Sequence, residues 1–466
     1  DGDRDHWREV IPDEIWRGVT TDHSQCTNRH CAYFDNCAFF DARRHLDQAD
    51  IIIANHDLVL ADLALGGGAI LPKPEDTVYV FDEAHHLPDK ALSHFAAHAP
   101  LEGGRSWLKQ LAQILARMLP ALPAAGVMAR TLENAAEFGR ATDQGLTVVL
   151  EWILENTPWE DTEGRTRTWR YPGGEIPEAL RGLAKVVLEG VAGLCRTLGV
   201  LNEELQKGFD ERKTSEADRE TADAWFPVVG TLLNRAEEWL RLWQSFAQAD
   251  TPGQGPPPAR WLEQQRWEHT SDVVLFSSPI LADDLLYTRL WSRCHAAILT
   301  SATLTALGRF DRLRMQAGLP EHSRYQVVPS AFRYAEMATV EVPLMPAEPG
   351  DSDAYTQALI RRLPELWGDE RGVLVLFNSR RQMQDVRAAL DAIWPDLILG
   401  QDDHARGEVL RRHRERIDGG QRSILFGVAS FAEGIDLPGE YLQHVIITRL
   451  PFAVPDDPIE ASLAEW

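Results

Sequence analysis

Short apolar segments of strand length lie toward both ends of this 466-residue chain, and a long stretch with helical periodicity separates them. Helical segments alternate with several of the apolar ones, for example at 381–393. Such alternation is typical of parallel sheets covered by helices. We therefore expect an α/β protein with parallel sheets in its first and last parts. The strand-like segments are 51–54, 78–81, 272–276, 296–300, 373–377, 423–426 and 444–448.

The stretch from residue 87 to residue 266 has a different pattern. Apolar residues recur at helical spacing in 107–118, 176–198 and 222–247, and strand patterns are sparse. Eight of the fifteen tryptophans lie in this stretch, and we interpret them as core residues rather than as a ligand site. We expect an all-α domain here.

Composition narrows the class of protein. Hydrophobic residues make up 44% and charged residues 25%, as in an ordinary globular chain. No apolar run approaches the roughly 18 residues of a membrane span, so we expect no membrane attachment. A net charge of -24 argues against nucleic-acid binding over the whole surface but leaves a local basic groove open. Five cysteines are too few for a disulfide scaffold and suit a reducing cytoplasm.

The strongest chemical signal is the apolar segment 78–81, which runs directly into Asp-Glu-Ala-His at 82–85. A strand that ends in two carboxylates delivers both to the carboxyl edge of a sheet, where α/β proteins bind ligands. Nucleotide hydrolysis needs one carboxylate for Mg²⁺ and a second polar group that orients the attacking water. Asp82 suits the first role and Glu83 the second. The alternatives are a solvated acidic turn and a metal site that adds the histidines at 85–86 to Glu83.

A phosphate-binding loop should accompany such a site. Its Gly-Lys-Ser/Thr core requires a lysine directly after a glycine, and none of the 33 glycines has one. Either the nucleotide interpretation is wrong or the loop lies upstream of Asp1. The chain begins with Asp rather than Met, and no targeting segment follows, so we expect it to be part of a longer protein.

Small hydroxyl residues at 301–303 (Ser-Ala-Thr) directly follow the strand-like segment 296–300. Hydroxyl groups at a strand end can connect a nucleotide site to a neighbouring groove through hydrogen bonds. On its own, this sequence is better interpreted as a common strand-end turn.

The loop 427–439 gathers Ser430, Glu433 and Asp436 among three glycines. Loops of this kind allow close approach to phosphate or sugar. The aromatic ring of Phe431 is a candidate for stacking on a base. The alternative is a turn-rich connection between two strands.

In this order and spacing, these segments resemble the motifs of superfamily 2 helicases. The sequences at 82–85, 301–304 and 430–436 are similar to those of the XPD-like iron–sulfur helicases, in their bacterial DinG-type branch. Segments 52–58 and 448–452 also resemble that branch. The resemblance covers nearly the whole chain. It implies two RecA-like motor domains, with an iron–sulfur segment and an all-α Arch domain inserted in the first.

The resemblance also implies an activity and site residues. It implies ATP-driven 5′→3′ movement on single-stranded or forked DNA, in repair or replication restart alongside replication or repair proteins. Mg²⁺ would be held by Asp82, within a DEAH box. The implied sites are Asp82, Glu83 and His85 for catalysis; Ser301, Ala302 and Thr303 for coupling to DNA; Glu433, Gly434 and Asp436 for the nucleotide; and Asn55, Ser430 and Phe431 for DNA.

Three clustered cysteines, Cys26, Cys31 and Cys37, have the spacing C-x4-C-x5-C. Thiolates are soft ligands that suit zinc or iron–sulfur clusters. The resemblance implies a [4Fe–4S] cluster whose fourth ligand lies before Asp1. The alternatives are a zinc site completed by His23 or His30, and three free thiols. The two other cysteines are in apolar contexts and are expected to be core thiols; they are Cys195 and Cys294.

The resemblance divides the chain into five parts. The expected boundaries are 1–49 for the last part of the iron–sulfur domain, 50–86 and 267–308 for motor domain 1, 87–266 for the Arch domain and 309–466 for motor domain 2.

Two departures from the family pattern bear on activity. The phosphate-binding loop is absent, and so is a final Gln-x-x-Gly-Arg-x-x-Arg motif, expected beyond Trp466. We therefore expect the longer parent protein to hydrolyse ATP and this chain by itself to be inactive. The rival hypothesis is a non-catalytic DNA-binding protein with a helicase-like fold. A basic run at 411–414 is either a phosphate contact or a solvated helix face.

Overall fold

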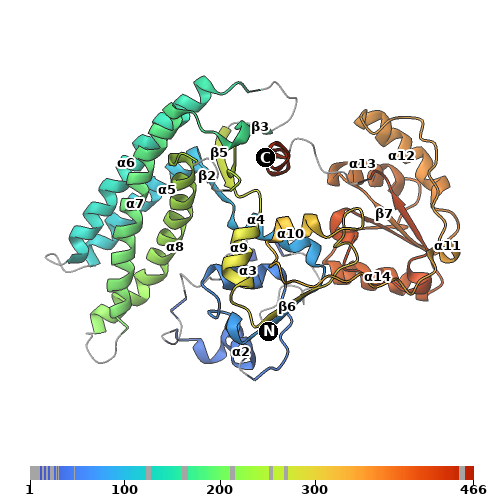
Figure 1. Ribbon diagram of the computed structural model, residues 1–466, viewed down its shortest axis with the longest axis horizontal. Helices are drawn as coiled ribbons and strands as arrows, with labels where there is room; N and C mark the ends of the chain where they lie inside the picture. The colour runs from blue at the N-terminus through green and yellow to red at the C-terminus, as the bar shows by residue number, and fades with distance from the viewer. Residues whose placement is uncertain are drawn as a thin grey trace. The chain divides into compact units, whose positions relative to one another are not determined.

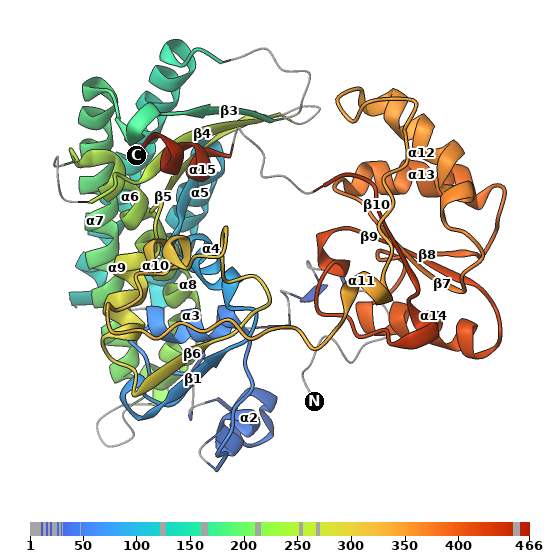
Figure 2. The ribbon, with the colours of Figure 1, turned by 45° about the vertical axis from the view of Figure 1, so that its right-hand side comes forward.

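The computed structural model describes residues 11–12, 15–16, 19–20, 26–27, 29, 31–46, 48–121, 127–159, 166–209, 216–250, 255–266, 271–450 and 457–466. The chain divides into two compact units (Figures 1 and 2). The first unit comprises 21–326 together with 455–466, and the second comprises 1–20 together with 327–454.

A short parallel pair of strands, β1 (Val78–Phe81) and β6 (Ala296–Leu299), lies in the first unit. Phe81 is 3% exposed and belongs to a core that also contains apolar residues of α3 (His56–Ala64) and α4 (Leu87–Phe95). The parallel pairing confirms the prediction for these two segments. Because parallel strands end at the same edge of a sheet, the residues that follow β1 and β6 are brought side by side.

The segment 51–54, for which we predicted a buried strand, is not a strand in the structure. Ile51 and Ile53 are 83% and 97% exposed, and within the described chain no strand pairs with this segment. An apolar run indicates a preference for a strand, but a strand also needs a neighbour for its ladder hydrogen bonds. The prediction was therefore wrong for these residues.

Four long helices form a bundle in the first unit, and tryptophans lie in its core (Figure 1). Trp107, Trp239 and Trp243 are at most 5% exposed, which confirms their predicted core position. The bundle is closely packed: a Cβ placed on Gly104 would lie 2.4 Å from the ring of Trp239, so this position has no room for a side chain. The helices are α5 (Leu101–Met118), α6 (Val127–Asn156), α7 (Glu178–Lys207) and α8 (Glu216–Ala247).

An antiparallel sheet in the order β2-β5-β4-β3 adjoins the bundle. The predicted all-α domain over 87–266 was therefore wrong in missing these strands, and the apolar run 272–276 lies in this sheet rather than in a parallel one. Polar residues at buried positions of β4 hide the alternation that marks a strand. Arg260, for example, is 1% exposed and donates to both carboxylate oxygens of Asp250. The strands are β2 (Ala97–Pro100), β3 (Thr166–Arg170), β4 (Ala259–Arg266) and β5 (Ser271–Ser278).

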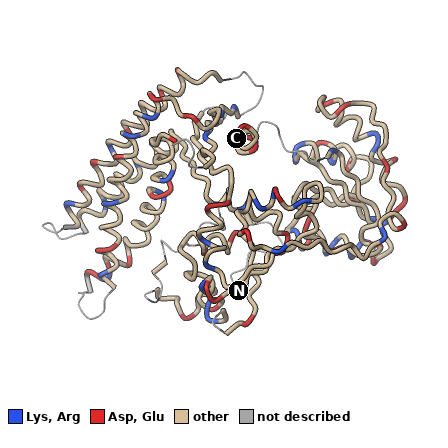
Figure 3. The backbone as a smooth tube through the Cα atoms, in the orientation of Figure 1, with Lys and Arg blue, Asp and Glu red and all other residues tan. Residues whose placement is uncertain are grey.

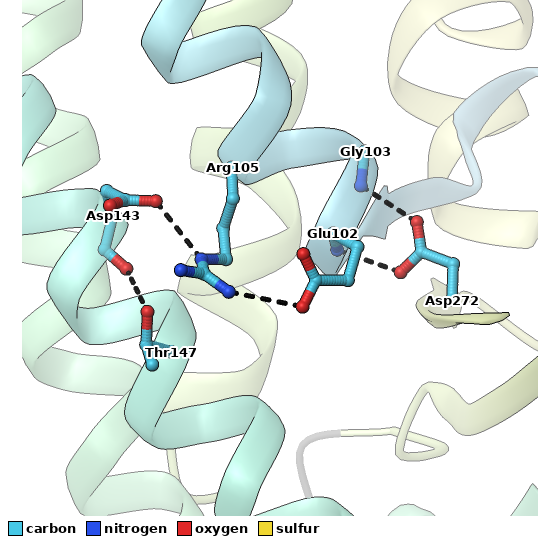
Figure 4. Close-up of polar contacts among 6 residues, drawn as sticks. All are labelled: Glu102, Gly103, Arg105, Asp143, Thr147 and Asp272. Atoms are coloured by element: carbon cyan, nitrogen blue, oxygen red, sulfur yellow. Dashed lines mark hydrogen bonds and ion pairs between the residues drawn. The ribbon is translucent and has the colours of Figure 1, made fainter. Parts of the chain in front are cut away.

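Asp272, near the start of β5, joins this sheet to the bundle (Figure 4). Its two carboxylate oxygens accept the backbone N–H groups of Glu102 and Gly103, each at 2.8 Å, in the first turn of α5. Arg105 extends the network by donating to the carboxylates of Glu102 at 3.1 Å and Asp143 of α6 at 3.2 Å. Helix N-termini are usually capped by a neighbouring residue. Here the cap comes from 170 positions along the chain.

The second unit is built on a parallel sheet in the order β10-β7-β9-β8, as predicted for this part of the chain (Figure 2). Helices α12 (Ser352–Leu366) and α13 (Arg380–Asp391) share a core with Val373 on one face. Helix α14 (Arg406–Asp418) shares a core with Leu374 on the other face. The strands are β7 (Gly372–Leu376), β8 (Ile398–Gly400), β9 (Ser423–Gly427) and β10 (His444–Ile447).

The last helix, α15 (Pro458–Glu465), belongs to the first unit although the second unit precedes it in the chain. Ile459 and Leu463 pack against an apolar cluster that includes Trp261 of β4. Glu465 forms an ion pair with Arg170 of β3, which lowers the pKa of this carboxyl group to about 2. The chain thus passes from the first unit into the second and back.

Charged residues are distributed along the bundle rather than gathered into blocks. Figure 3 shows Lys and Arg interspersed with Asp and Glu on the long helices. None of the described helices is both long and apolar enough to cross a membrane.

Candidate nucleotide site

The turn after β1 places two carboxylates at the carboxyl edge of the parallel pair. Glu83 adopts a left-handed backbone conformation, with φ 48° and ψ 43°, and its N–H donates to Oδ1 of Asp82 at 3.0 Å. The next N–H, of Ala84, donates to the carbonyl oxygen of Thr300 at 3.0 Å. A non-glycine residue with positive φ is strained, and such strain often occurs at functional sites. Both carboxylates are exposed, so they are accessible to a ligand.

A single hydroxyl group joins the two motifs that follow β1 and β6. Ser301 Oγ donates to Glu83 Oε2 at 3.1 Å and lies 2.8 Å from Nδ1 of His85. A hydroxyl has one proton, so if it donates to Glu83, it accepts a hydrogen bond from Nδ1–H of His85. Ser301 Oγ also accepts the N–H of Thr303 at 3.2 Å. The structure therefore brings Glu83, His85 and 301–303 together at one edge of the parallel pair.

His56 is a member of this site for which the sequence analysis gave no role. Its ring centroid lies 5.7 Å from that of Phe81, the residue before Asp82. Burial lowers the pKa of His56, and the nearby backbone of Asp82 opposes this effect. The signal was present, because segment 52–58 resembles a family motif, but only folding shows which of its side chains reaches Asp82.

Asn55, predicted as a DNA contact, begins α3. Its Oδ1 accepts the N–H of Leu58 at 2.8 Å, so the side chain is the N-cap of this helix. The structure gives Asn55 a structural role and leaves its predicted contact with DNA as a prediction.

The loop after β9 presents polar groups of the second unit. Glu433, Gly434 and Asp436 are exposed on it, as is Ser430. Phe431 is 2% exposed and packs in the apolar core beneath the loop. In this structure its ring is therefore not available for stacking on a base, and the prediction of a stacking role was wrong.

The basic run at 411–414 mostly serves the fold. Arg411 and Arg412 form ion pairs with Glu408, which lies three and four positions before them on the same helical face, and Arg411 also pairs with Glu415. His413 is fully buried. These contacts favour the interpretation as a helix face over a phosphate contact for the first three residues of the run.

Cys26 and Cys31 lie before a 3-10 turn (Phe34–Asn36), and Cys37 lies between this turn and α2 (Ala38–Leu46). All three are partly exposed. Among the described residues, their sulfur atoms do not form a set within 4.8 Å of one another. His23 and His30, the alternative zinc ligands, lie outside the described residues.

Cys195 and Cys294 behave as the predicted core thiols. Cys195 packs against the core of the bundle, and Cys294 packs against the core beneath β1. Burial raises the pKa of Cys195 to about 11 and also raises the pKa of Cys294, so both groups are held as thiols rather than as reactive thiolates.

Comparison with known proteins identifies relatives along the whole chain. Family models match at 19–98, described as DEAD_2, and at 368–466, described as a helicase C-terminal domain. The chain is 36% identical over 476 residues to the ATP-dependent DNA helicase DinG of Photobacterium profundum, with 100% of the chain and 66% of the relative covered. It is 30% identical to the proteins of the same name from Salmonella typhimurium and Escherichia coli K12, covering 65% and 64% of them.

Solved structures give a weaker match. The structure of S. tokodaii Xpd4 aligns with a TM-score of 0.41 and 14% identity, over 85% of this chain and 64% of that one. A TM-score this low adds nothing to the sequence comparison. The alignments with the DinG relatives include every part of this chain. The chain spans about two thirds of the length of these relatives. It therefore belongs to the DinG-type helicases.

Proposed function

We propose that this chain supplies the motor of an ATP-dependent DNA helicase that moves 5′→3′ on single-stranded or forked DNA. The observation that carries the proposal is the hydrogen-bonded set of Glu83, Ser301 and His85 at the edge shared by β1 and β6. Relatives that match over the whole chain are named ATP-dependent DNA helicases. Their activity extends to this chain as a proposal, because the chain spans only part of their length.

In the proposed reaction the two exposed carboxylates have separate roles. Mg²⁺, when bound with ATP, neutralises charge on the phosphates. Asp82 fits as its ligand, because a carboxylate at the end of a strand is the oxygen donor this ion prefers. Glu83 orients the attacking water, and the hydroxyl of Ser301 holds one of its oxygens at 3.1 Å.

Ser301, Ala302 and Thr303 couple hydrolysis to DNA. The hydroxyl that holds Glu83 also bonds His85 and the N–H of Thr303. A displacement of Glu83 during hydrolysis is thus transmitted directly to the backbone of 301–303. In the second unit, Glu433, Gly434 and Asp436 contact the nucleotide, while Ser430 faces DNA.

We also propose that Cys26, Cys31 and Cys37 are ligands of a [4Fe–4S] cluster. Thiolates are soft ligands that suit an iron–sulfur cluster, and all three side chains are partly exposed. Anaerobically purified protein should show broad visible absorption that reductant bleaches; colourless protein with stoichiometric zinc would refute this.

The proposed cellular setting follows from the proposed activity. We place the protein in the cytoplasm, in DNA repair or replication restart, where replication or repair proteins would be its partners. The charge of -24 fits contact with DNA in a local groove rather than over the whole surface.

A second candidate is a non-catalytic DNA-binding protein with a helicase-like fold, which would lack a Gly-Lys-Ser/Thr loop in its complete reading frame. Strand displacement by the protein expressed from its complete reading frame separates the two. A helicase with the proposed polarity unwinds a duplex with a 5′ single-stranded tail in the presence of ATP and leaves a 3′-tailed duplex intact. Binding to both substrates without unwinding would support the second candidate.

A further inference from the structure

We infer that Gln401, Arg406 and Arg414, three residues outside the helicase motifs, are positioning residues for the loop 428–436. This inference rests on the proposed function, because it concerns the loop that carries the proposed nucleotide and DNA contacts of the second unit. The three side chains come from one continuous segment, which runs from the end of β8 through α14. They hold the two halves of the loop separately.

Gln401 holds the first half, next to the proposed DNA contact. Its side-chain Oε1 accepts two hydrogen bonds, from the N–H of Val428 at 2.9 Å and from Oγ of Ser430 at 3.0 Å. Gln401 is only 9% exposed, and its own N–H donates to the carbonyl oxygen of Phe426 in β9 at 3.0 Å. The side chain is therefore fixed to the sheet at one end and to the loop at the other.

Arg406 and Arg414 hold the second half, next to the proposed nucleotide contacts. Arg406 donates to the carbonyl oxygen of Glu433 at 2.6 Å, and Arg414 donates to that of Asp436 at 2.7 Å. The guanidinium of Arg406 also lies 5.8 Å from the centroid of the Phe431 ring. Both arginines bind backbone carbonyls, so they fix the path of the loop while the side chains of Glu433 and Asp436 stay exposed.

Gly434 lies in the loop between the two residues whose carbonyls accept these bonds. Its lack of a side chain leaves room for the guanidinium of Arg406. Its φ of 66° is in the left-handed region, which favours glycine. A Cβ at this position would lie 3.2 Å from Nη2 of Arg406. The proposed nucleotide residue and the arginine are thus fitted to each other.

Arg411, on the same helix α14, provides a comparison for Arg414. Arg411 pairs with Glu408 and Glu415, both on its own helix. It carries the same charge as Arg414 and lies one turn away, but it pairs within α14 rather than with the loop. Replacement of Arg411 by Met is therefore a matched control for Arg414→Met.

Hydrogen exchange on this chain tests the positioning by itself. Gln401→Leu removes the acceptor of the Val428 N–H at similar volume, and we expect exchange of the 428–432 amides to accelerate about tenfold. Arg406→Met and Arg414→Met should accelerate exchange in the peptide 428–437 to a similar extent. Arg411→Met should stay within twofold of wild type. Unchanged exchange in Gln401→Leu and Arg414→Met, or an equal effect of Arg411→Met, would overturn the inference.

DNA-stimulated ATP hydrolysis by the protein with its complete reading frame tests the division between the two halves. Gln401→Leu should raise the DNA concentration for half-maximal stimulation about tenfold and leave the KM for ATP within twofold. Arg406→Met and Arg414→Met should raise the KM for ATP about tenfold and leave the DNA concentration for half-maximal stimulation within twofold. Gln401→Glu, which keeps an acceptor oxygen, and Arg414→Lys, which keeps a donor, should restore most of the loss.

The outcomes separate this inference from the proposed function. In a merely structural role, every variant would raise both the KM for ATP and the DNA concentration for half-maximal stimulation, and would lower the melting temperature. That result would overturn the assignment of Gln401 to the DNA half of the loop and of the two arginines to the nucleotide half. A wild-type protein without DNA-stimulated hydrolysis would overturn the proposed function. In that case hydrogen exchange alone still decides whether the three residues position the loop.

Discussion

The hydroxyl of Ser301 is the smallest group on which the proposed coupling depends. It bonds Glu83 at 3.1 Å and His85 at 2.8 Å, so it connects the strand ends of β1 and β6. Small displacements of a group that orients a reactant cost large factors in rate. The side chain therefore matters more for the rate of hydrolysis than for stability.

Ser301→Ala should lower kcat of DNA-stimulated ATP hydrolysis by about tenfold to a hundredfold, because Glu83 loses the donor that orients it. Binding of single-stranded DNA without nucleotide should stay within twofold. Steady-state kinetics of the protein with its complete reading frame measure the first quantity and fluorescence anisotropy the second. Ser292→Ala, at an exposed serine of the same unit, is the control. Wild-type kcat in Ser301→Ala would contradict the coupling.

His413 makes the stability of the second unit depend on pH. The ring is fully buried between Oγ of Ser423, at 2.9 Å from Nδ1, and the carbonyl oxygen of Tyr441, at 2.7 Å from Nε2. Burial lowers the pKa of His413 below 6.5, and the bond to Tyr441 opposes this effect. Below pH 6.5 the unfolded chain therefore binds a proton that the folded chain excludes. The stabilisation is complete above pH 6.5 and is lost as the pH falls toward the folded pKa.

Urea denaturation at pH 7.5 and pH 5.5 tests this dependence. The wild-type free energy of unfolding should fall more between the two pH values than that of His413→Gln, whose side chain does not titrate. His322→Gln, at an exposed histidine, should keep the wild-type difference. Equal differences for wild type and His413→Gln would show that this histidine does not titrate with unfolding.

At the scale of elements, the N-terminus of α5 depends on a residue of β5. Asp272 is 9% exposed and accepts two N–H groups of the first helical turn, while the local N-cap position, Pro100, offers no side-chain bond. Asp272→Ala leaves both donors without this acceptor. We expect the free energy of unfolding to fall by about 1–2 kcal/mol.

Thermal or urea unfolding of the chain measures the effect of Asp272→Ala. Asp272→Asn keeps one acceptor oxygen and should recover part of the loss. Asp223→Ala, at an exposed aspartate of α8, should change stability by less than about 0.5 kcal/mol. A similar change in Asp223→Ala and Asp272→Ala would show that the cap does not stabilise α5.

Elements with a strong local pattern were predictable, and elements that depend on distant partners were not. Helices α5, α7 and α8 follow apolar periodicity, and Trp107, Trp239 and Trp243 of α5 and α8 are buried. The antiparallel sheet was missed because its central strand β4 buries Arg260, whose charge is paired with Asp250. Segment 51–54 has the composition of a strand but has no neighbour in the described chain.

At the scale of the candidate site, the residue types were predictable and their contacts were not. Asp82, Glu83 and Ser301 were found from the sequence because each follows a strand-like segment. The hydrogen bond between Ser301 and Glu83 depends on the parallel pairing of β1 and β6, which are 218 positions apart at this contact. The burial of Phe431 similarly depends on α14 and the sheet beneath it.

At the scale of the whole molecule, the described chain holds two parallel sheets, each followed at its carboxyl edge by a loop of polar residues. The first loop contains Glu83 and the second contains Glu433 and Asp436. The whole of this chain aligns with DinG-type helicases, and it spans about two thirds of their length. The central claim is that the first of these loops hydrolyses ATP in response to DNA.

The most direct test is the rate of ATP hydrolysis with and without single-stranded DNA, for the protein with its complete reading frame and for its Glu83→Gln variant. Gln keeps the size of the side chain but is a poor acceptor for a proton of the attacking water. We predict that DNA stimulates the wild type severalfold or more, and that Glu83→Gln lowers the stimulated kcat at least a hundredfold while ATP still binds. Absence of stimulation in the wild type, or wild-type kcat in Glu83→Gln, would contradict the account.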